Sequence, residues 1–92
     1  MSKEKKYVQS PDALLTEGDG DGVFLQLQSE KYFTLNKVGM DVYKAILNND
    51  NQEEIIRKIT QKYDVDKDTA AKDIKKITND LVSKKIIIES SN

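Results

Sequence analysis

The chain has 92 residues, of which 37% are hydrophobic and 34% charged, and its formal net charge is −1. A chain of this length forms one domain with a small core, and no apolar run approaches the ~20 residues that a membrane-spanning helix needs. Because Cys and His are both absent, disulfides, thiol nucleophiles, Cys-ligated zinc and the commonest general base are excluded, and we expect no catalytic residue, cofactor or metal.

The front of the chain has the pattern of a small antiparallel sheet. Residues 1–11 are charged and include the Ser10-Pro11 step, so we expect a flexible tail there, with no signal peptide and a cytoplasmic location. Residues 13–16 are a short candidate strand, and the Gly- and Asp-rich segment 17–22 has the composition of a hairpin loop. The strand at 23–28 then alternates, and its apolar face is formed by Val23, Leu25 and Leu27.

The last predicted strand covers residues 31–35, where aromatic and β-branched side chains favour a pleated surface. Phe33 and Leu35 share one face with Lys31, and Tyr32 and Thr34 share the other. We expect Phe33 to lie in the core and Tyr32 to be exposed. Because a helical pattern begins directly afterwards, this strand is an edge of the sheet, with unpaired backbone N–H and C=O groups.

Three helices are predicted in the back half. Asn36, Asn51 and Asp66 can cap their N-termini, and Asn51 forms an approximate capping box with Glu54. Each helix has an apolar stripe at three- and four-residue spacing. The stripes are Val38, Val42, Tyr43, Ile46 and Leu47, then Ile55, Ile56, Ile59 and Tyr63, and finally Ala70, Ile74, Ile77 and Leu81 in a helix over residues 67–84.

The order of these elements predicts an α+β, winged-helix-like fold, in which a three-stranded antiparallel sheet is followed by three helices. Residues 86–88 are all Ile, and we expect them to pack on the core as a short extended segment. We place the domain at residues 12–89, between a flexible N-terminal tail at 1–11 and a C-terminal tail at 90–92.

The loop at residues 17–22 also resembles the start of a calcium-binding loop, because Glu17, Asp19 and Asp21 alternate before Gly22. The twelfth position of such a loop carries a bidentate Glu, whereas this chain has Gln28. The following residues also have the pattern of a strand and not of a helix. We therefore interpret the segment as a plain turn.

The third helix carries several lysines that could contact phosphates, as a DNA-recognition helix does. They are Lys72, Lys75 and Lys76, and the same helix also carries Asp68, Asp73 and Asp80. Carboxylates would repel a nucleic-acid backbone, and the chain has no basic excess overall. A solvated helix face with alternating charges is the simpler interpretation, so nucleic acid is not the partner we expect.

In their order and spacing, the features of residues 14–89 resemble the PqqD family, named after protein D of pyrroloquinoline quinone biosynthesis. Its domain is known as the precursor-peptide (RiPP) recognition element. The residues that carry the resemblance are the strand at 23–28, Leu35-Asn36, Gly39, Tyr43, Glu54-Ile55, Tyr63-Asp64-Val65-Asp66, Asp73-Ile74, Ile77 and Leu81. Three positions depart from the family pattern: Tyr43 stands where Trp is usual, Thr78 where an apolar residue is common, and Lys85 where a glycine often ends the helix.

The resemblance implies a non-catalytic protein that captures the leader segment of a ribosomally made precursor peptide and presents it to a modifying enzyme or leader protease. The leader would add as a fourth strand beside residues 31–35, in a cleft between this strand and the third helix. This expectation agrees with the edge strand predicted from the residues themselves, because strand addition needs an unpaired edge.

We expect the helical wall of that cleft to be the stripe beside the core, formed by Ala71, Lys75, Thr78 and Val82. Val82 would be an apolar anchor, and Lys75 with Lys72 would pair with acidic leader residues. The candidate peptide-binding residues are therefore Lys31, Tyr32, Phe33, Thr34, Leu35, Ala71, Lys72, Ile74, Lys75, Thr78 and Val82.

Two other functions remain open on the sequence alone. A winged-helix transcription regulator would share this fold, because fold does not determine function. A structural adaptor could bind a partner enzyme through the same edge strand. The class of peptide, the partner enzyme and the oligomeric state have no signature in the sequence.

Overall fold

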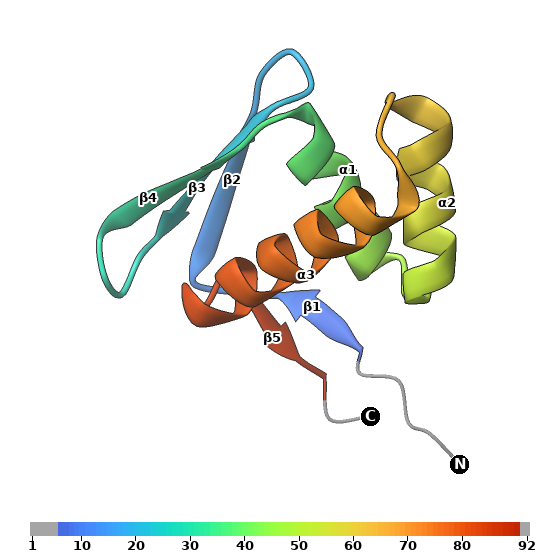
Figure 1. Cartoon of the computed structure of the whole chain (residues 1–92). Helices are drawn as coiled ribbons and strands as arrows, with labels where there is room; N and C mark the ends of the chain where they lie inside the picture. The colour runs from blue at the N-terminus through green and yellow to red at the C-terminus, as the bar shows by residue number, and fades with distance from the viewer. Residues whose placement is uncertain (1–5, 91–92) are drawn as a thin grey trace.

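The computed structural model describes residues 6–90. The chain forms, in order, β1 (Tyr7–Gln9), β2 (Ala13–Glu17), β3 (Gly22–Gln26), β4 (Lys31–Leu35), α1 (Lys37–Leu47), α2 (Gln52–Lys62), α3 (Lys67–Ser83) and β5 (Ile87–Glu89) (Figure 1). The strands β2, β3 and β4 form an antiparallel sheet in that order, and the three helices follow it. The predicted fold class is therefore confirmed. None of the helices in the described part of the chain is long and apolar enough to cross a membrane.

The N-terminal tail is shorter than expected. Residues 1–5 lie outside the described residues, but Tyr7–Gln9 form β1, which pairs antiparallel with β5. Ser10 is buried, and its backbone N–H donates to the carbonyl oxygen of Ile86 at 2.9 Å. The expectation of a flexible segment up to Pro11 is wrong for these residues, because a partner strand from the other end of the chain supplies the backbone hydrogen bonds.

The C-terminal Ile run packs as expected and also forms the partner of β1. Ile86 and Ile87 are fully buried, whereas Ile88 is exposed opposite Val8 on the outer face of the two-stranded ribbon. The backbone N–H of Ser90 donates to the carbonyl oxygen of Lys6 at 2.8 Å, so the pairing continues one step into the predicted C-terminal tail. Residues 91 and 92 of that tail lie outside the described residues.

The strand β3 presents the opposite face to the core from the one its alternation suggests. Phe24 and Gln26 are buried, whereas Val23 is 39% exposed and Leu27 is 45% exposed in the turn that follows. Phe24 meets Tyr43 of α1 edge to face, with ring centroids 5.0 Å apart. One fully buried aromatic ring and one hydrogen-bonded amide therefore outweigh three aliphatic side chains in setting the orientation of the strand.

The helix starts are those predicted from the sequence. The backbone N–H of Gly39 donates to the side chain of Asn36 at 2.9 Å, and Asp66 caps α3 in the same way. Asn51 and Glu54 form the complete capping box at α2. These caps satisfy backbone donors that have no partner within the helix, and they fix where each helix begins.

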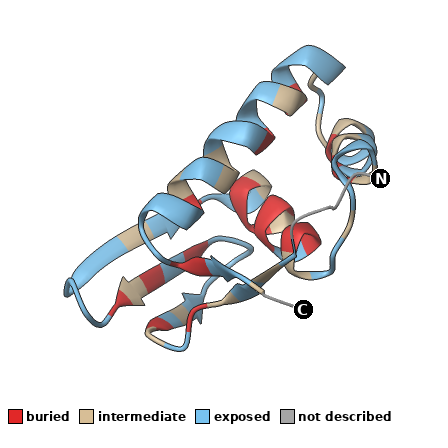
Figure 2. Cartoon of the chain, turned by 90° about the horizontal axis from the view of Figure 1, so that it is seen from below, coloured by how far each residue is buried: buried red, intermediate tan, exposed pale blue. Residues whose placement is uncertain are grey.

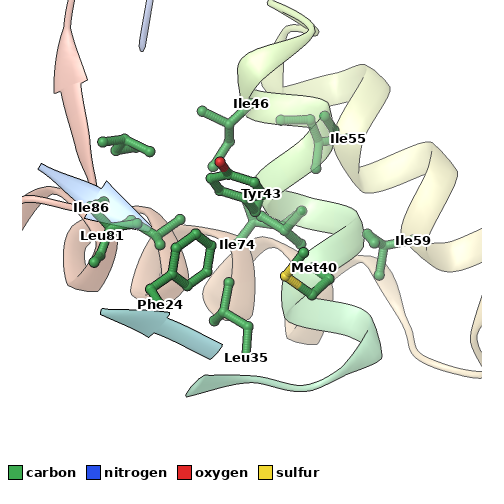
Figure 3. Close-up of a cluster of buried hydrophobic side chains, with 14 of the residues drawn as sticks. Phe24, Leu35, Met40, Tyr43, Ile46, Ile55, Ile59, Ile74, Leu81 and Ile86 are labelled. Atoms are coloured by element: carbon green, nitrogen blue, oxygen red, sulfur yellow. The ribbon is translucent and has the colours of Figure 1, made fainter. Parts of the chain in front are cut away.

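The core lies where α1 meets the sheet and α3. Figure 2 shows buried positions gathered on α1 and on the strands that face it, while α3 is exposed along much of its length. In Figure 3, Phe24 and Leu35 from the sheet meet Tyr43 and Met40 from α1, with Ile74 and Leu81 contributed by α3. The predicted stripes of all three helices supply this core, and α3 is held against it by its buried side.

Candidate functional site

The outermost strand of the sheet on one side is β4, whose one partner among residues 6–90 is β3 (Figure 1). Lys31, Tyr32 and Thr34 are exposed, and Tyr32 is exposed over 72% of its surface. Phe33 is half-buried and Leu35 is buried, both on the inner face, as the alternation predicts. Along its free side, β4 presents backbone N–H and C=O groups that another extended chain can pair with.

Beside this edge lies a hollow of about 520 Å³ between β4 and α3. Its apolar surface comes from the inner face of β4, from α1, from Ile59 of α2, from Val65 before α3 and from one flank of α3. Its charged groups are two carboxylates and one ammonium, all on α3. The lining residues are Phe33, Thr34, Leu35, Asn36, Val38, Gly39, Ile59, Val65, Asp73, Lys76, Ile77 and Asp80.

A second hollow of about 470 Å³ lies at the Lys31 end of β4, beside the C-terminus of α3. It is lined by Gln26, Gln28, Ser29, Lys31, Tyr32, Phe33, Ser83, Lys84, Lys85 and Ile86. Phe33 borders both hollows, so they adjoin at this residue along β4. We call the two hollows together the β4–α3 groove, with a Leu35 end and a Lys31 end.

All five candidate residues of β4 line the groove: Lys31, Tyr32, Phe33, Thr34 and Leu35. The candidates from α3 do not. Ile74 is buried in the core, Val82 is 42% exposed, and neither hollow touches them. The predicted helical wall therefore does not line these hollows, and neither do Ala71, Lys72, Lys75 and Thr78, so their role in peptide binding stays a prediction.

The difference between the expected wall and the lining of the groove concerns which flank of α3 faces β4. At 3.6 residues per turn, the core stripe of Ala70, Ile74 and Leu81 has one parallel stripe on each side. The predicted wall lies on one side, and the wall in the structure, which includes Ile77, lies on the other. Thr78 turns its hydroxyl back to the carbonyl oxygen of Ile74 at 2.8 Å. Periodicity alone does not distinguish the two flanks, because both border the buried face.

Sequence reasoning missed the α3 residues that do line the groove. They are Asp73, Lys76, Ile77 and Asp80 at the Leu35 end, and Ser83 and Lys84 at the Lys31 end. Ile77 was assigned to the core stripe, and it is half-buried at the boundary between core and groove. The signal available in the sequence was an apolar residue with aspartates four positions before and three positions after it.

The Lys31 end of the groove is held in place by a buried amide. The side-chain N–H of Gln26 donates to the carbonyl oxygen of Lys85 at 2.9 Å, and its side-chain oxygen accepts the N–H of Gln28 at 2.7 Å. At the C-terminus of α3, the backbone N–H of Ile86 donates to the carbonyl oxygen of Leu81, and Lys85 takes a left-handed conformation with φ 58°. These bonds fix the C-terminus of α3 relative to β3.

The Leu35 end depends on a close approach between strand and helix. A Cβ at Gly39 would lie 2.9 Å from Cδ2 of Leu35 and 3.1 Å from its Cβ. Only glycine leaves room there for Leu35 to pack against the first turn of α1. This contact packs the end of β4 closely against the start of α1.

A hollow of about 660 Å³ between α1 and α2 lies outside the groove. Its lysines are already paired: Lys44 with Glu17 at 3.0 Å, Lys62 with Asp41 at 2.9 Å, and Lys58 with Asp50. Partial burial alone would raise the pKa of Asp41, but hydrogen bonds from the Tyr63 hydroxyl and the Lys62 ammonium outweigh it and hold the pKa below its usual value. The pair of Lys62 with Asp41 ties α2 to α1.

The Gly- and Asp-rich segment forms the β2–β3 hairpin loop, as predicted. Gly20 has φ 92°, and the N–H of Gly18 donates to the carbonyl oxygen of Asp21 at 3.0 Å. Glu17 is engaged by Lys44. Within residues 6–90, no three acidic side chains gather closely enough to hold a metal ion.

Two solved structures are similar to this chain over nearly its whole length. One is TbiB1 in complex with the TbiA(beta) leader peptide, which is 26% identical, with a TM-score of 0.75 over 91% of this chain and 98% of that chain. The other is lasso peptide synthetase B1 complexed with the leader peptide, which is 19% identical, with a TM-score of 0.80 over 90% of this chain and 98% of that chain. The second likeness concerns the fold alone.

The search of curated proteins found no match for this sequence. The family model described as coenzyme PQQ synthesis protein D (PqqD) matches residues 21–87, which include β3, β4, all three helices and the first residue of β5. The resemblance noted from the sequence is thereby confirmed, and the chain belongs to the PqqD family.

Proposed function

We propose that this protein captures the leader segment of a ribosomally made precursor peptide by strand addition at β4. It presents the peptide to a modifying enzyme or leader protease and does no chemistry itself. The cytoplasm, where ribosomes release such precursors, is the compartment we propose. The observation that carries the proposal is the unpaired edge of β4 beside a groove, in a fold shared with two proteins bound to leader peptides.

Strand addition suits the geometry because backbone groups of β4 can supply hydrogen bonds to any extended peptide. Specificity then depends on the groove, where alternate side chains of the added strand point toward α3. Phe33, Leu35, Val38, Val65 and Ile77 give an apolar surface at the Leu35 end. Burial of apolar leader side chains there is the main source of affinity that we propose.

The test is equilibrium binding to a fluorescent synthetic leader taken from a short open reading frame beside the gene. We expect saturable binding that survives moderate salt, since the anchor is apolar. Duplex DNA of similar mass is the second probe, and we expect it to bind only at low salt. Failure of the leader to bind, with salt-resistant binding of DNA, would reject this proposal in favour of a transcription regulator.

A further inference from the structure

The two ends of the β4–α3 groove differ in charge. Three ammonium groups line the Lys31 end, from Lys31, Lys84 and Lys85, and no carboxylate lines it. At the Leu35 end, Asp73 and Asp80 of α3 lie with one lysine among apolar side chains. A peptide lying along β4 therefore passes from an apolar, carboxylate-bearing hollow to a cationic one.

The three lysines at this end are available to a ligand. The ion pairs found within residues 6–90 use Lys44, Lys58 and Lys62, so none of them neutralises the Lys31 end. The carboxylates nearest to these lysines along the chain do not line this hollow. Glu30 precedes β4, Asp80 stands one helical turn before Lys84 and lines the hollow at the Leu35 end, and Glu89 belongs to β5.

Lys84 is held over the groove and does not extend freely into solvent. Its ammonium lies 5.5 Å from the centre of the Phe33 ring, within range of a cation–π contact. Phe33 belongs to both hollows, so this contact places a positive charge at the point where they join.

The sheet itself suggests the direction of an added strand. Both neighbouring pairs, β2 with β3 and β3 with β4, are antiparallel. A peptide that continues this pattern runs from the Leu35 end toward the Lys31 end, opposite to β4. Its C-terminal half then lies beside the lysines, about four residues, or about 13 Å of extended chain, beyond the residue at Leu35.

From these observations we propose that Lys31, Lys84 and Lys85 form a cationic subsite that selects an acidic residue in the C-terminal half of the leader segment. This residue follows, by about four positions, an apolar residue seated at the Leu35 end. The proposal rests on leader capture at β4 and specifies the peptide chemistry of that same site. The lysines at the end of the groove would thus select the acidic residue, in place of Lys72 and Lys75 on the other flank of α3.

The test is selection from a displayed library of random 12-residue peptides on the immobilised full chain. We expect enriched peptides with Asp or Glu about four positions C-terminal to an apolar residue. Lys84→Glu should remove this preference or shift it toward Lys and Arg. Lys75→Glu makes the same charge change on the opposite flank of α3 and should preserve the preference.

A matched pair of synthetic peptides then measures the effect directly. Replacing the acidic residue by its amide should weaken binding to the natural chain by about two- to fivefold at low salt, as exposed ion pairs do, and by less at high salt. The Lys84→Glu protein should no longer favour the acidic peptide.

Two results would overturn the proposal in different ways. Enriched peptides without an acidic preference, or with acidic residues before the apolar one, would reject the cationic subsite and leave leader capture intact. Failure of both the library and the leader encoded beside the gene to bind would reject leader capture, and the subsite with it.

Discussion

Ile77 and Val82 of α3 give opposite predictions for the two flanks of the helix. Ile77 is half-buried in the β4–α3 groove, and Val82 is 42% exposed on the far flank. Full burial of such a side chain contributes about 1.5–3 kcal/mol, so covering the exposed part of Ile77 with a bound leader contributes about 1 kcal/mol. Ile77→Asp removes this contribution and adds a carboxylate between Asp73 and Asp80, where like charges repel.

We therefore expect Ile77→Asp to weaken leader binding by at least about tenfold, since 1.4 kcal/mol corresponds to a factor of ten. Val82→Asp makes an equivalent polar change and should leave the affinity within about twofold of the natural chain. The assay is calorimetric titration with the leader encoded beside the gene, and thermal unfolding followed by circular dichroism gives the folded fraction of each variant. Ile77→Ala, which adds no charge, keeps the test valid if the Asp variant unfolds.

The opposite ranking would refute this account of the groove. If Val82→Asp abolished binding while Ile77→Asp preserved it, the leader would occupy the flank of α3 first expected from the sequence. An equal loss of affinity in both variants, with both proteins folded, would mean that leader binding does not distinguish between the two flanks of α3.

Three further predictions concern the stability of the fold, one at the contact of α1 with α2 and two at the Lys31 end of the groove. The pKa of Asp41 is lowered in the folded protein, so the stabilising effect of its carboxylate is complete above the unfolded pKa of about 4 and is lost as pH falls through the folded pKa. We therefore expect the melting temperature of Asp41→Asn to fall less steeply below pH 4 than that of the natural chain. An equal slope in the two proteins would refute this. Lys85→Gly should raise the free energy of unfolding by about 0.5–1 kcal/mol, because glycine adopts φ 58° without a steric cost, and urea unfolding measures it. Gln26→Leu should lower the free energy of unfolding by about 1–3 kcal/mol, because the Lys85 carbonyl and the Gln28 N–H lose their buried hydrogen-bond partner. An unchanged free energy of unfolding would contradict the importance of the Gln26 hydrogen bonds.

Local signals account for what the sequence predicted well. Asn36, Asn51 and Asp66 mark the helix starts because capping depends on residues within one turn of each other. The edge position of β4 followed from the immediate switch between a two-residue and a 3.6-residue period. These features need no knowledge of distant contacts.

The features that were missed depend on distant contacts. β1 is stable only because β5 returns to it from the opposite end of the chain, and three residues of strand carry no distinctive pattern. The orientation of β3 depends on Phe24 meeting Tyr43 and on Gln26 finding partners, which alternation alone does not reveal. The flank of α3 that faces the groove depends on how the helix is placed against the sheet, because both flanks satisfy the same period.

The most direct test of leader capture is the measurement of cross-strand nuclear Overhauser effects between a labelled leader and the labelled protein. We expect contacts between α-protons of the leader and of β4 in an antiparallel register, with leader side chains close to Ile77. Contacts along the other edge strand, β2, or along the Val82 flank of α3 without any to β4, would contradict strand addition at this groove.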